Sequence, residues 1–156
     1  MDKKFQSFVD ALHPQFERLQ DAQPIQRGKF NVGLLLEGIY LFSENGVDLY
    51  VGRSRNIQRR YGLHTRPSAK HNQASFAFQL AKKELNLGPS SYRSDAQSRD
   101  GLSKDPEFLR VFNDAKRKVR EMDFKWVEER DPTRQALLEI YCAVALGTQF
   151  NSFKTH

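Results

Sequence analysis

The sequence contains a single cysteine and only four histidines among its 156 residues. An internal disulfide is therefore impossible, and a cysteine-rich zinc site is excluded. Long apolar runs are also missing, because the longest strongly apolar stretch, residues 32–36, is far shorter than the roughly 18 residues of a membrane span. The first residues, Met1-Asp2-Lys3-Lys4, lack the apolar segment of a secretory signal. We therefore expect a cytoplasmic protein that does not enter a membrane.

Acidic side chains are absent from one long part of the chain. The formal net charge is +6 and the pI is near 9.5, yet no Asp or Glu occurs between Tyr50 and Lys83. The basic residues in that stretch are Arg53, Arg55, Arg59, Arg60, Arg66, Lys70, Lys82 and Lys83. A surface of this kind releases counterions when it meets a polyanion, which favours a nucleic-acid partner. The alternative is a solvated basic face without a partner, and charge alone does not decide between the two.

Apolar residues are plentiful enough for one folded domain, with 38% hydrophobic residues and twelve Phe. The opening segment is predicted to be an amphipathic helix, because its apolar residues recur three or four positions apart: Phe5, Phe8, Val9, Leu12, Phe16 and Leu19. Pro14 lies within it, so we expect a break or kink near His13, or a later start. Gln23-Pro24 and Arg27-Gly28 mark a linker, and residues 1–30 are interpreted as an N-terminal helical extension.

Two β-prone runs, residues 34–42 and 48–53, surround an Asn45-Gly46 pair, which is a strong hairpin signal. Two turn geometries suit this sequence. A two-residue loop at Asn45-Gly46 would place Tyr40 and Tyr50 on opposite faces of the hairpin. A three-residue loop that starts at Glu44 would put Gly46 in the left-handed conformation of a bulge, and Tyr40 would then stand directly opposite Tyr50.

A short basic helix is predicted next, capped by Asn56 or by Ser54 and running to about Leu63. Arg60 and His64 are four residues apart and therefore share a face near its end. The remaining predicted elements are a helix over 75–87 stopped by Gly88-Pro89, an exposed, mobile loop over 89–104, a helix over 106–121, a strand over 122–128, and a helix that Asp131-Pro132 opens and Gly147 ends.

The helix predicted over 106–121 has two contrasting sides. Its apolar side, which we expect to face inward, carries Phe108, Val111, Phe112, Ala115 and Val119. Its other side is basic and carries Arg110, Lys116, Arg117, Lys118 and Arg120. These basic residues are therefore expected to be exposed.

Glu139 is the most unusual residue by its local surroundings. It lies on an apolar helical run, and no basic residue stands one helical turn away from it. A carboxylate in such a place is costly unless a cation meets it. One interpretation is an ion pair with an arginine from the sheet or from the basic helix. The other is a ligand for a hard divalent ion such as Mg²⁺, which often takes one or two protein carboxylates and keeps its waters.

Taken singly, the strand tyrosines suggest packing, and Arg60 and His64 suggest ordinary surface residues. Their order is more specific. Gly38-Ile39-Tyr40 is followed ten residues later by Tyr50-Val51-Gly52, Arg60 stands ten residues after Tyr50, and His64 four after Arg60. With Glu139 and Asn151 downstream, this pattern resembles the GIY-YIG nuclease domain of bacterial excision-repair nucleases and phage homing endonucleases. The resemblance is close over residues 35–65 and looser over 122–153.

The resemblance implies a metal-dependent DNA endonuclease that hydrolyses phosphodiester bonds with one Mg²⁺, which Mn²⁺ can replace. Tyr40 and Tyr50 would contact the scissile phosphate or the attacking water, with Tyr40 the favoured proton acceptor. Arg60 would neutralise the charge on the phosphate, His64 would polarise the water or bind the phosphate, and Glu139 would hold the metal. These roles need both tyrosines on one face, so we favour the three-residue turn.

The same resemblance implies an α/β (α+β) fold, in which a small, mainly antiparallel three-stranded sheet is flanked by helices over residues 31–156, with an insertion at 66–121. Asn151 and Gly52 would support the site. The residues expected to contact DNA are Arg53, Arg55, Arg59, Arg66 and Lys70. The alternative is a non-catalytic or regulatory nucleic-acid-binding module, and an unpaired Glu139 on an apolar face favours catalysis over it. DNA repair, restriction and mobile-element cutting stay open, as do a homodimer and a separate targeting protein.

Overall fold

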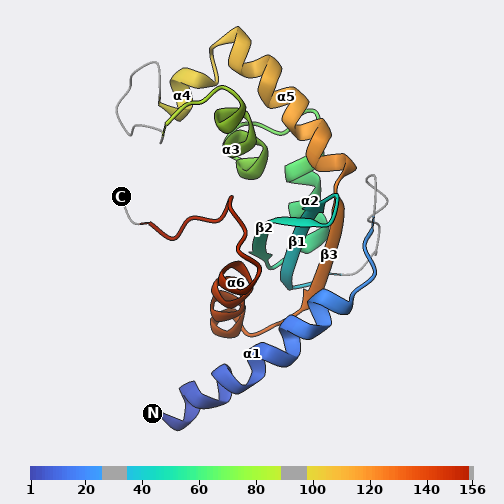
Figure 1. Cartoon of the computed structure of the whole chain (residues 1–156), viewed down its shortest axis with the longest axis vertical. Coiled ribbons are helices and arrows are strands. Elements are labelled where there is room, and N and C mark those ends of the chain that lie inside the picture. Colours follow the sequence, from blue (N-terminus) through green and yellow to red (C-terminus); the bar gives the residue numbers. More distant parts are fainter. Residues whose placement is uncertain (26–34, 89–97, 155–156) are drawn as a thin grey trace. The chain divides into compact units, whose positions relative to one another are not determined.

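The structure is a computed structural model that describes residues 1–25, 35–88 and 98–154 (Figure 1). The chain divides into two compact units. The sheet unit comprises Met1–Tyr61 and Met122–His156, and the helical unit comprises Gly62–Glu121. In sequence, the helical unit is therefore an insertion within the sheet unit. Among the described helices, none is long and apolar enough to cross a membrane.

An antiparallel sheet of three strands forms the centre of the sheet unit. The strand order is β2-β1-β3, and β1 pairs with both neighbours. The strands are β1 (Gly38–Glu44), β2 (Val47–Ser54) and β3 (Asp123–Glu128), and the helices are α1 (Lys3–Asp21), α6 (Pro132–Leu146) and the first part of α2 (Ile57–Thr65). Both α1 and α6 contribute buried residues to the same hydrophobic core as the sheet. The predicted mixed α+β fold, with a three-stranded antiparallel sheet flanked by helices, is confirmed.

The β1–β2 turn differs from the favoured prediction. Asn45 and Gly46 both have positive φ angles, 52° and 78°, as a two-residue turn of the mirror-image type requires. Ser43 pairs with Asp48, whereas Phe42 pairs with Tyr50, so the register shifts by one residue after the turn. The predicted three-residue loop is therefore wrong. The extra residue lies in a β-bulge at position 49 of β2, outside the turn itself.

Helix α1 runs unbroken through Pro14, so the predicted break near His13, or a later start, is wrong. The helix begins where Asp2 accepts a hydrogen bond of 2.8 Å from the backbone N–H of Phe5. Proline inside a helix costs about 3 kcal/mol. Each large apolar side chain that is buried stabilises the fold by about 1.5–3 kcal/mol, which outweighs this cost. The buried side chains on α1 are Leu12, Phe16 and Leu19.

The caps predicted for two helices of the sheet unit are confirmed. Asp131 accepts hydrogen bonds of 2.9 Å from the N–H groups of Thr133 and Arg134, and Gly147 ends α6 with a φ of 64°. At α2, both candidate caps are used. Asn56 accepts a bond of 2.9 Å from the Arg59 N–H, and Ser54 accepts one of 3.0 Å from the Asn56 N–H. Local sequence therefore positions the helices that carry Arg60 and Glu139.

The helical unit contains α3 (Ser75–Glu84), α4 (Arg99–Leu102) and α5 (Pro106–Glu121). The predicted inward residues of α5 are buried, and its predicted bounds are confirmed. Helix α3 ends three residues earlier than predicted, because Asn86 takes a left-handed φ of 55°. A short helix, α4, replaces the end of the predicted loop, and its Leu102 is buried. Residues 89–97 of that loop lie outside the described residues, as does the predicted linker pair Arg27-Gly28.

Lys116 on α5 is buried, contrary to the prediction that it lies on the exposed basic side. Only 3% of its surface is accessible. Its ammonium group donates hydrogen bonds to the carbonyl oxygens of Pro67 and Ala69, at 2.6 and 2.8 Å. The long side chain thus joins α5 to the segment that follows α2.

Candidate active site

Tyr40 and Tyr50 lie on the same face of the hairpin. Tyr40 and Phe42 are two residues apart on β1 and therefore share a face, and Phe42 is the cross-strand partner of Tyr50. The two tyrosine rings are tilted, with 6.3 Å between their centroids. The expectation of a shared face is thus confirmed by a different route, since the tyrosines are diagonal neighbours and the bulge, not the turn, brings them together.

Glycine at position 52 makes room for Tyr40. Gly52 is the cross-strand partner of Tyr40, and a Cβ atom there would lie 2.2 Å from the Tyr40 hydroxyl oxygen and 2.3 Å from Cζ. The ring therefore lies across the glycine. At Gly38, a Cβ atom would lie 2.0 Å from the carbonyl oxygen of Val127, so the start of β1 also depends on a missing side chain. At both Gly38 and Gly52, a larger residue would overlap a neighbouring part of the sheet unit.

Arg60 on α2 connects the two tyrosines. Its Nε atom donates to the Tyr40 hydroxyl at 3.4 Å, and its side chain also hydrogen-bonds Tyr50. Burial alone would lower the pKa of Arg60, but the two tyrosines outweigh it and the pKa is raised. Arg60 is therefore a permanent cation held beside two phenolic oxygens.

Tyr40 is almost completely buried, with 2% of its surface accessible. Its ring stacks on that of Phe124 at a centroid distance of 5.7 Å, which fixes its orientation. Burial raises the pKa of its phenol far above the usual range, the nearby Tyr50 raises it further, and Arg60 offsets only part of this. Tyr40 is consequently a neutral phenol at physiological pH.

Glu139 on α6 is paired with Arg53 on β2. Arg53 Nε donates to Glu139 Oε2 at 3.0 Å, with 47% and 22% of the two side chains accessible. The expectation of an unpaired carboxylate is therefore wrong, and the alternative of an ion pair with an arginine from the sheet is confirmed. Burial still raises the pKa of Glu139, and Arg53 offsets only part of that rise. The Glu139 charge also acts to raise the pKa of Tyr40, so the carboxylate belongs to the same electrostatic group.

Asn151 holds the strand between the two motif residues of β2. Its side-chain Oδ1 accepts from the N–H of Val51 at 2.9 Å, and its Nδ2 donates to the carbonyl of Val51 at 2.7 Å. Thr148 Oγ1 donates a further bond of 2.7 Å to Oδ1. Because Val51 lies between Tyr50 and Gly52, the amide of Asn151 fixes the backbone that positions both. The supporting role that the resemblance implies for Asn151 stays a prediction.

The sheet unit brings together seven of the expected site residues: Tyr40, Tyr50, Gly52, Arg53, Arg60, Glu139 and Asn151. Arg55 and Arg59 are also in this unit, and both are exposed. His64, Arg66 and Lys70 belong to the helical unit. His64 is fully buried at the end of α2, whereas Arg66 and Lys70 are exposed. The proposed role of His64 stays a prediction.

The site offers one carboxylate, that of Glu139, to a hard divalent ion such as Mg²⁺. Within residues 1–25, 35–88 and 98–154, no three or more His, Cys, Asp or Glu side chains gather as a metal site would need. Mg²⁺ can instead be held by one carboxylate together with waters and substrate phosphate oxygens. Glu139 fits this smaller set, because it is partly accessible and the one hydrogen bond described for its carboxylate uses Oε2. It is therefore the candidate ligand.

Comparison of the chain with protein-family models, with curated proteins and with solved structures finds no match. The resemblance to the GIY-YIG domain consequently rests on the identity and order of residues in the sequence, and it stays a prediction.

Gly52 and Asn151 were expected as supporting residues, but sequence reasoning did not predict the contacts that explain them. Lys116 was missed as a buried residue, although its position four residues after Phe112 was an available signal. The ion pair of Arg53 with Glu139 had no local signal, because 86 residues separate the two side chains.

Proposed function

We propose that this protein is a metal-dependent DNA endonuclease whose active site is formed by Tyr40, Tyr50, Arg60 and Glu139. The observation that carries the proposal is the pair of tyrosines on one sheet face, both hydrogen-bonded to a single guanidinium. A phosphodiester develops negative charge as it is attacked, and a cation held between two hydroxyl groups can stabilise that charge.

Hydrolysis requires a water oxygen to bond to phosphorus while the bond from phosphorus to the 3′ oxygen breaks and that oxygen receives a proton. Arg60 stabilises the charge that grows on the phosphoryl oxygens, as a fixed cation with several planar N–H donors. Tyr50 is partly accessible and donates its hydroxyl hydrogen to the phosphate. Tyr40 orients the attacking water through its hydroxyl.

The raised pKa keeps the Tyr40 phenol protonated, so with Arg60 alone there is no phenolate to accept the proton of the attacking water. A divalent ion bound at Glu139 would supply the additional positive charge that lowers the pKa of a nearby phenol or water and stabilises the leaving oxygen. In this scheme Glu139 holds the ion, Arg60 acts on the phosphate, and Asn151 keeps Tyr50 in place.

One observation favours the alternative, a non-catalytic nucleic-acid-binding module on the same fold. The Arg53–Glu139 ion pair gives the carboxylate a partner within the protein, and a structural role would explain its presence. The two functions predict different effects of removing the charge of Glu139. Loss of a structural ion pair affects stability, whereas loss of a metal ligand affects cleavage.

The test is plasmid cleavage with Mg²⁺ or Mn²⁺, comparing the wild type with Glu139→Gln and Arg60→Gln. Each substitution is expected to reduce cleavage by about 10²–10³-fold without unfolding the protein. Glu128→Gln is the matched control, because Glu128 also forms an ion pair with an arginine, Arg130, at 2.7 Å. It should cleave like the wild type.

Undiminished cleavage by Glu139→Gln would remove Glu139 from the mechanism. Absence of cleavage by the wild type on duplex, nicked and branched DNA, with either metal, would replace the enzyme proposal with the binding module.

A further inference from the structure

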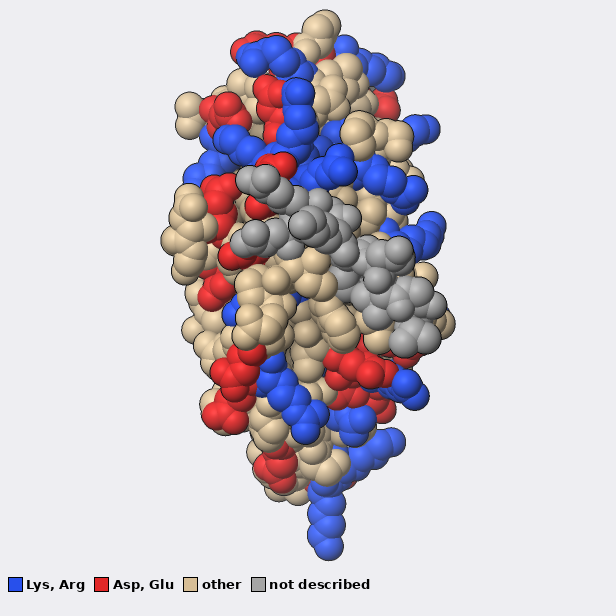
Figure 2. Space-filling view, turned by 90° about the vertical axis from the view of Figure 1, so that its right-hand side faces the viewer, with Lys and Arg blue, Asp and Glu red and all other residues tan. Residues whose placement is uncertain are grey.

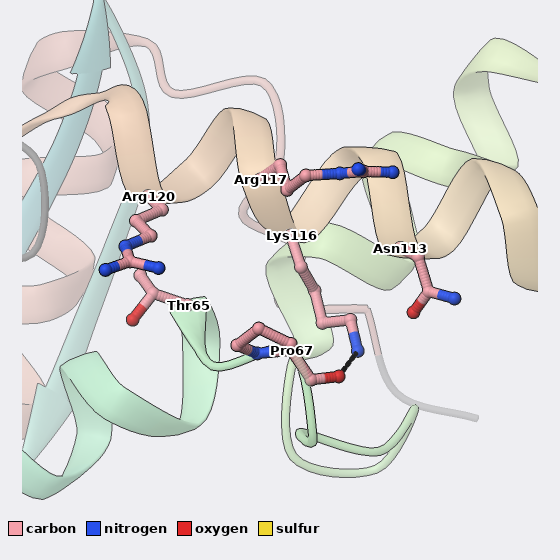
Figure 3. Close-up of a pocket in the computed structure, with 6 residues that line it drawn as sticks. All are labelled: Thr65, Pro67, Asn113, Lys116, Arg117 and Arg120. Atoms are coloured by element: carbon pink, nitrogen blue, oxygen red, sulfur yellow. Dashed lines mark hydrogen bonds between the residues drawn. The ribbon is translucent and has the colours of Figure 1, made fainter.

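A cavity of about 320 Å³ lies within the helical unit, between α5 and the segment that follows α2. Its lining residues are Thr65, Pro67, Asn113, Lys116, Arg117 and Arg120 (Figure 3). Arg120 points from α5 toward Thr65 and Lys116 toward Pro67, Asn113 extends from α5 beyond Lys116, and Arg117 runs along the helix. No Asp or Glu is among these lining residues. All the charged side chains that line this cavity are therefore basic.

Lys116 places a buried positive charge beside this cavity. Its ammonium contacts the carbonyl oxygens of Pro67 and Ala69 and lies 4.7 Å from the ring centroid of Phe112. These partners satisfy hydrogen bonds but carry no full negative charge, and in the described part of the chain no carboxylate pairs with this ammonium. Burial lowers the pKa of Lys116, as expected for a cation without a counter-ion. An anion in the cavity would compensate this charge.

The two arginines of the cavity keep donors available for such an anion. Arg120 is exposed and has no carboxylate partner in the described ranges. Within the described part of the chain, the hydrogen bond of Arg117 to Asp114 uses Nη2. A guanidinium has five N–H donors in a planar fork, so the Arg117 side chain retains others. Planar donors of this kind suit the oxygens of a phosphate group.

A second cavity of about 360 Å³ continues along α5 and shares Asn113 and Lys116 with the first. It extends to Lys70, His71 and Phe108. The two cavities together follow α5 from Phe108 to Arg120, a length of about 18 Å at 1.5 Å per residue. That length matches several nucleotides of one strand, at roughly 3.4 Å of rise each. A single free phosphate would fill only one end of it.

In the upper part of Figure 2, where α5 lies in Figure 1, Lys and Arg side chains are numerous and are interspersed with Asp and Glu side chains. Lys70, which was predicted to contact DNA, lines the second cavity. We name the two neighbouring cavities the α5 trough, defined by Lys70, Asn113, Lys116, Arg117 and Arg120.

We propose that the α5 trough binds the phosphodiester backbone of DNA, with Arg117 and Arg120 as the principal phosphate contacts. The ligand chemistry is the phosphate group, and the elongated shape of the trough assigns it to a polymer backbone rather than to free phosphate. This is a second nucleic-acid contact, in the helical unit, and it goes beyond the chemistry proposed for the sheet unit.

The test is the binding of a fluorescent 20-base-pair DNA duplex, measured by anisotropy over a range of salt concentrations with EDTA present. Chelation prevents cleavage, so binding is measured by itself. Arg117→Ala and Arg120→Ala should each weaken binding several-fold and reduce the slope of log K against log salt by about one. The matched controls are Arg110→Ala and Lys118→Ala, which remove the same charge from exposed positions of α5 outside the trough. Both should keep the wild-type slope.

A wild-type salt slope in Arg117→Ala and Arg120→Ala, or equal losses in the two controls, would overturn the proposal. Calorimetric titration with inorganic phosphate distinguishes binding of free phosphate from binding of the DNA backbone. Tight phosphate binding that is lost in the double variant, with DNA binding unchanged, would also overturn it. The wild type could also bind DNA through the trough and cut no DNA. That result would retain this inference and remove the proposed endonuclease activity.

Discussion

Arg53 on β2 and Glu139 on α6 are joined by a hydrogen-bonded ion pair, with 3.0 Å between Nε and Oε2. The pair links a sheet edge to a helix, yet it does not return the carboxylate to its ordinary acidity. Burial raises the pKa of Glu139, and the opposing effect of Arg53 is smaller. The ionised form of Glu139 is therefore held in the fold at a cost in stability, which is a common property of residues kept for chemistry.

Replacement of Glu139 by Gln should stabilise the protein increasingly as pH rises. A carboxyl group whose pKa is raised in the folded state stabilises the fold below its unfolded pKa of about 4.5, and this contribution is lost as pH rises through the folded pKa. Gln has no such loss. Urea unfolding of both proteins between pH 4 and pH 7 measures the difference. A wild type that gains stability relative to Glu139→Gln over this range would contradict the expectation.

Arg53→Ala should destabilise the protein by less than about 1 kcal/mol, because the pair is partly accessible to water. Arg55→Ala, at an exposed position two residues along the chain, is the matched control and should change stability less. The cost of Arg53→Ala should also shrink when Glu139 is already Gln, as a double-mutant cycle would measure. Equal costs in both backgrounds would mean that the ion pair contributes nothing.

Gly52→Ala should destabilise the fold by about 1–3 kcal/mol, because the new methyl group would overlap the Tyr40 ring and hydroxyl. The shifted ring would also leave its place beside Arg60, so cleavage should fall as well. Gly88→Ala is the control, since a Cβ atom at that exposed position meets nothing within 4 Å. Thermal unfolding of the two variants checks this, and equal melting temperatures would refute the steric role of Gly52.

The thiol of Cys142 should be unreactive in the folded protein. Its side chain is completely buried, and burial raises its pKa to about 12. The reactive thiolate is therefore almost absent at pH 8. Because the chain has one cysteine, labelling with a thiol reagent reports this residue alone. Labelling should occur only as fast as the protein unfolds in urea, and rapid labelling without urea would show that α6 opens locally.

Elements with strong local signals could be predicted from the sequence. Helix α6 has Asp131 and Gly147 at its ends, and each forms its capping hydrogen bonds with residues of the adjacent helical turn. The shared face of Tyr40 and Tyr50 was also predicted, but from the implied chemistry rather than from the turn. The bulge that produces it depends on a distant contact, because the carbonyl of Leu49 accepts a hydrogen bond from the N–H of Phe150 at 3.3 Å. A hairpin read by itself contains no such information.

Residue type was misleading where it opposed the helical period. Lys116 stands four residues after Phe112, on the buried side of α5, but a lysine in a basic run suggested an exposed position. Its burial became possible because the segment after α2 offers two carbonyl oxygens at the right place. The Arg53–Glu139 pair has the same character. The burial of Lys116 and the Arg53–Glu139 ion pair both depend on groups that are distant in sequence and lie close in the fold.

The contacts of Asn151 also bear on how copies of this protein can associate. Strand β2 is at one edge of the sheet, and an open edge offers unpaired N–H and C=O groups to a strand of another molecule. The amide of Asn151 occupies both groups of Val51, and Phe150 occupies the carbonyl of Leu49. At the opposite edge, Ile25 pairs with Phe124 of β3. Segments of the same chain thus occupy backbone groups at Leu49 and Val51 on one edge and at Phe124 on the other, and these groups are not available to a strand of another copy.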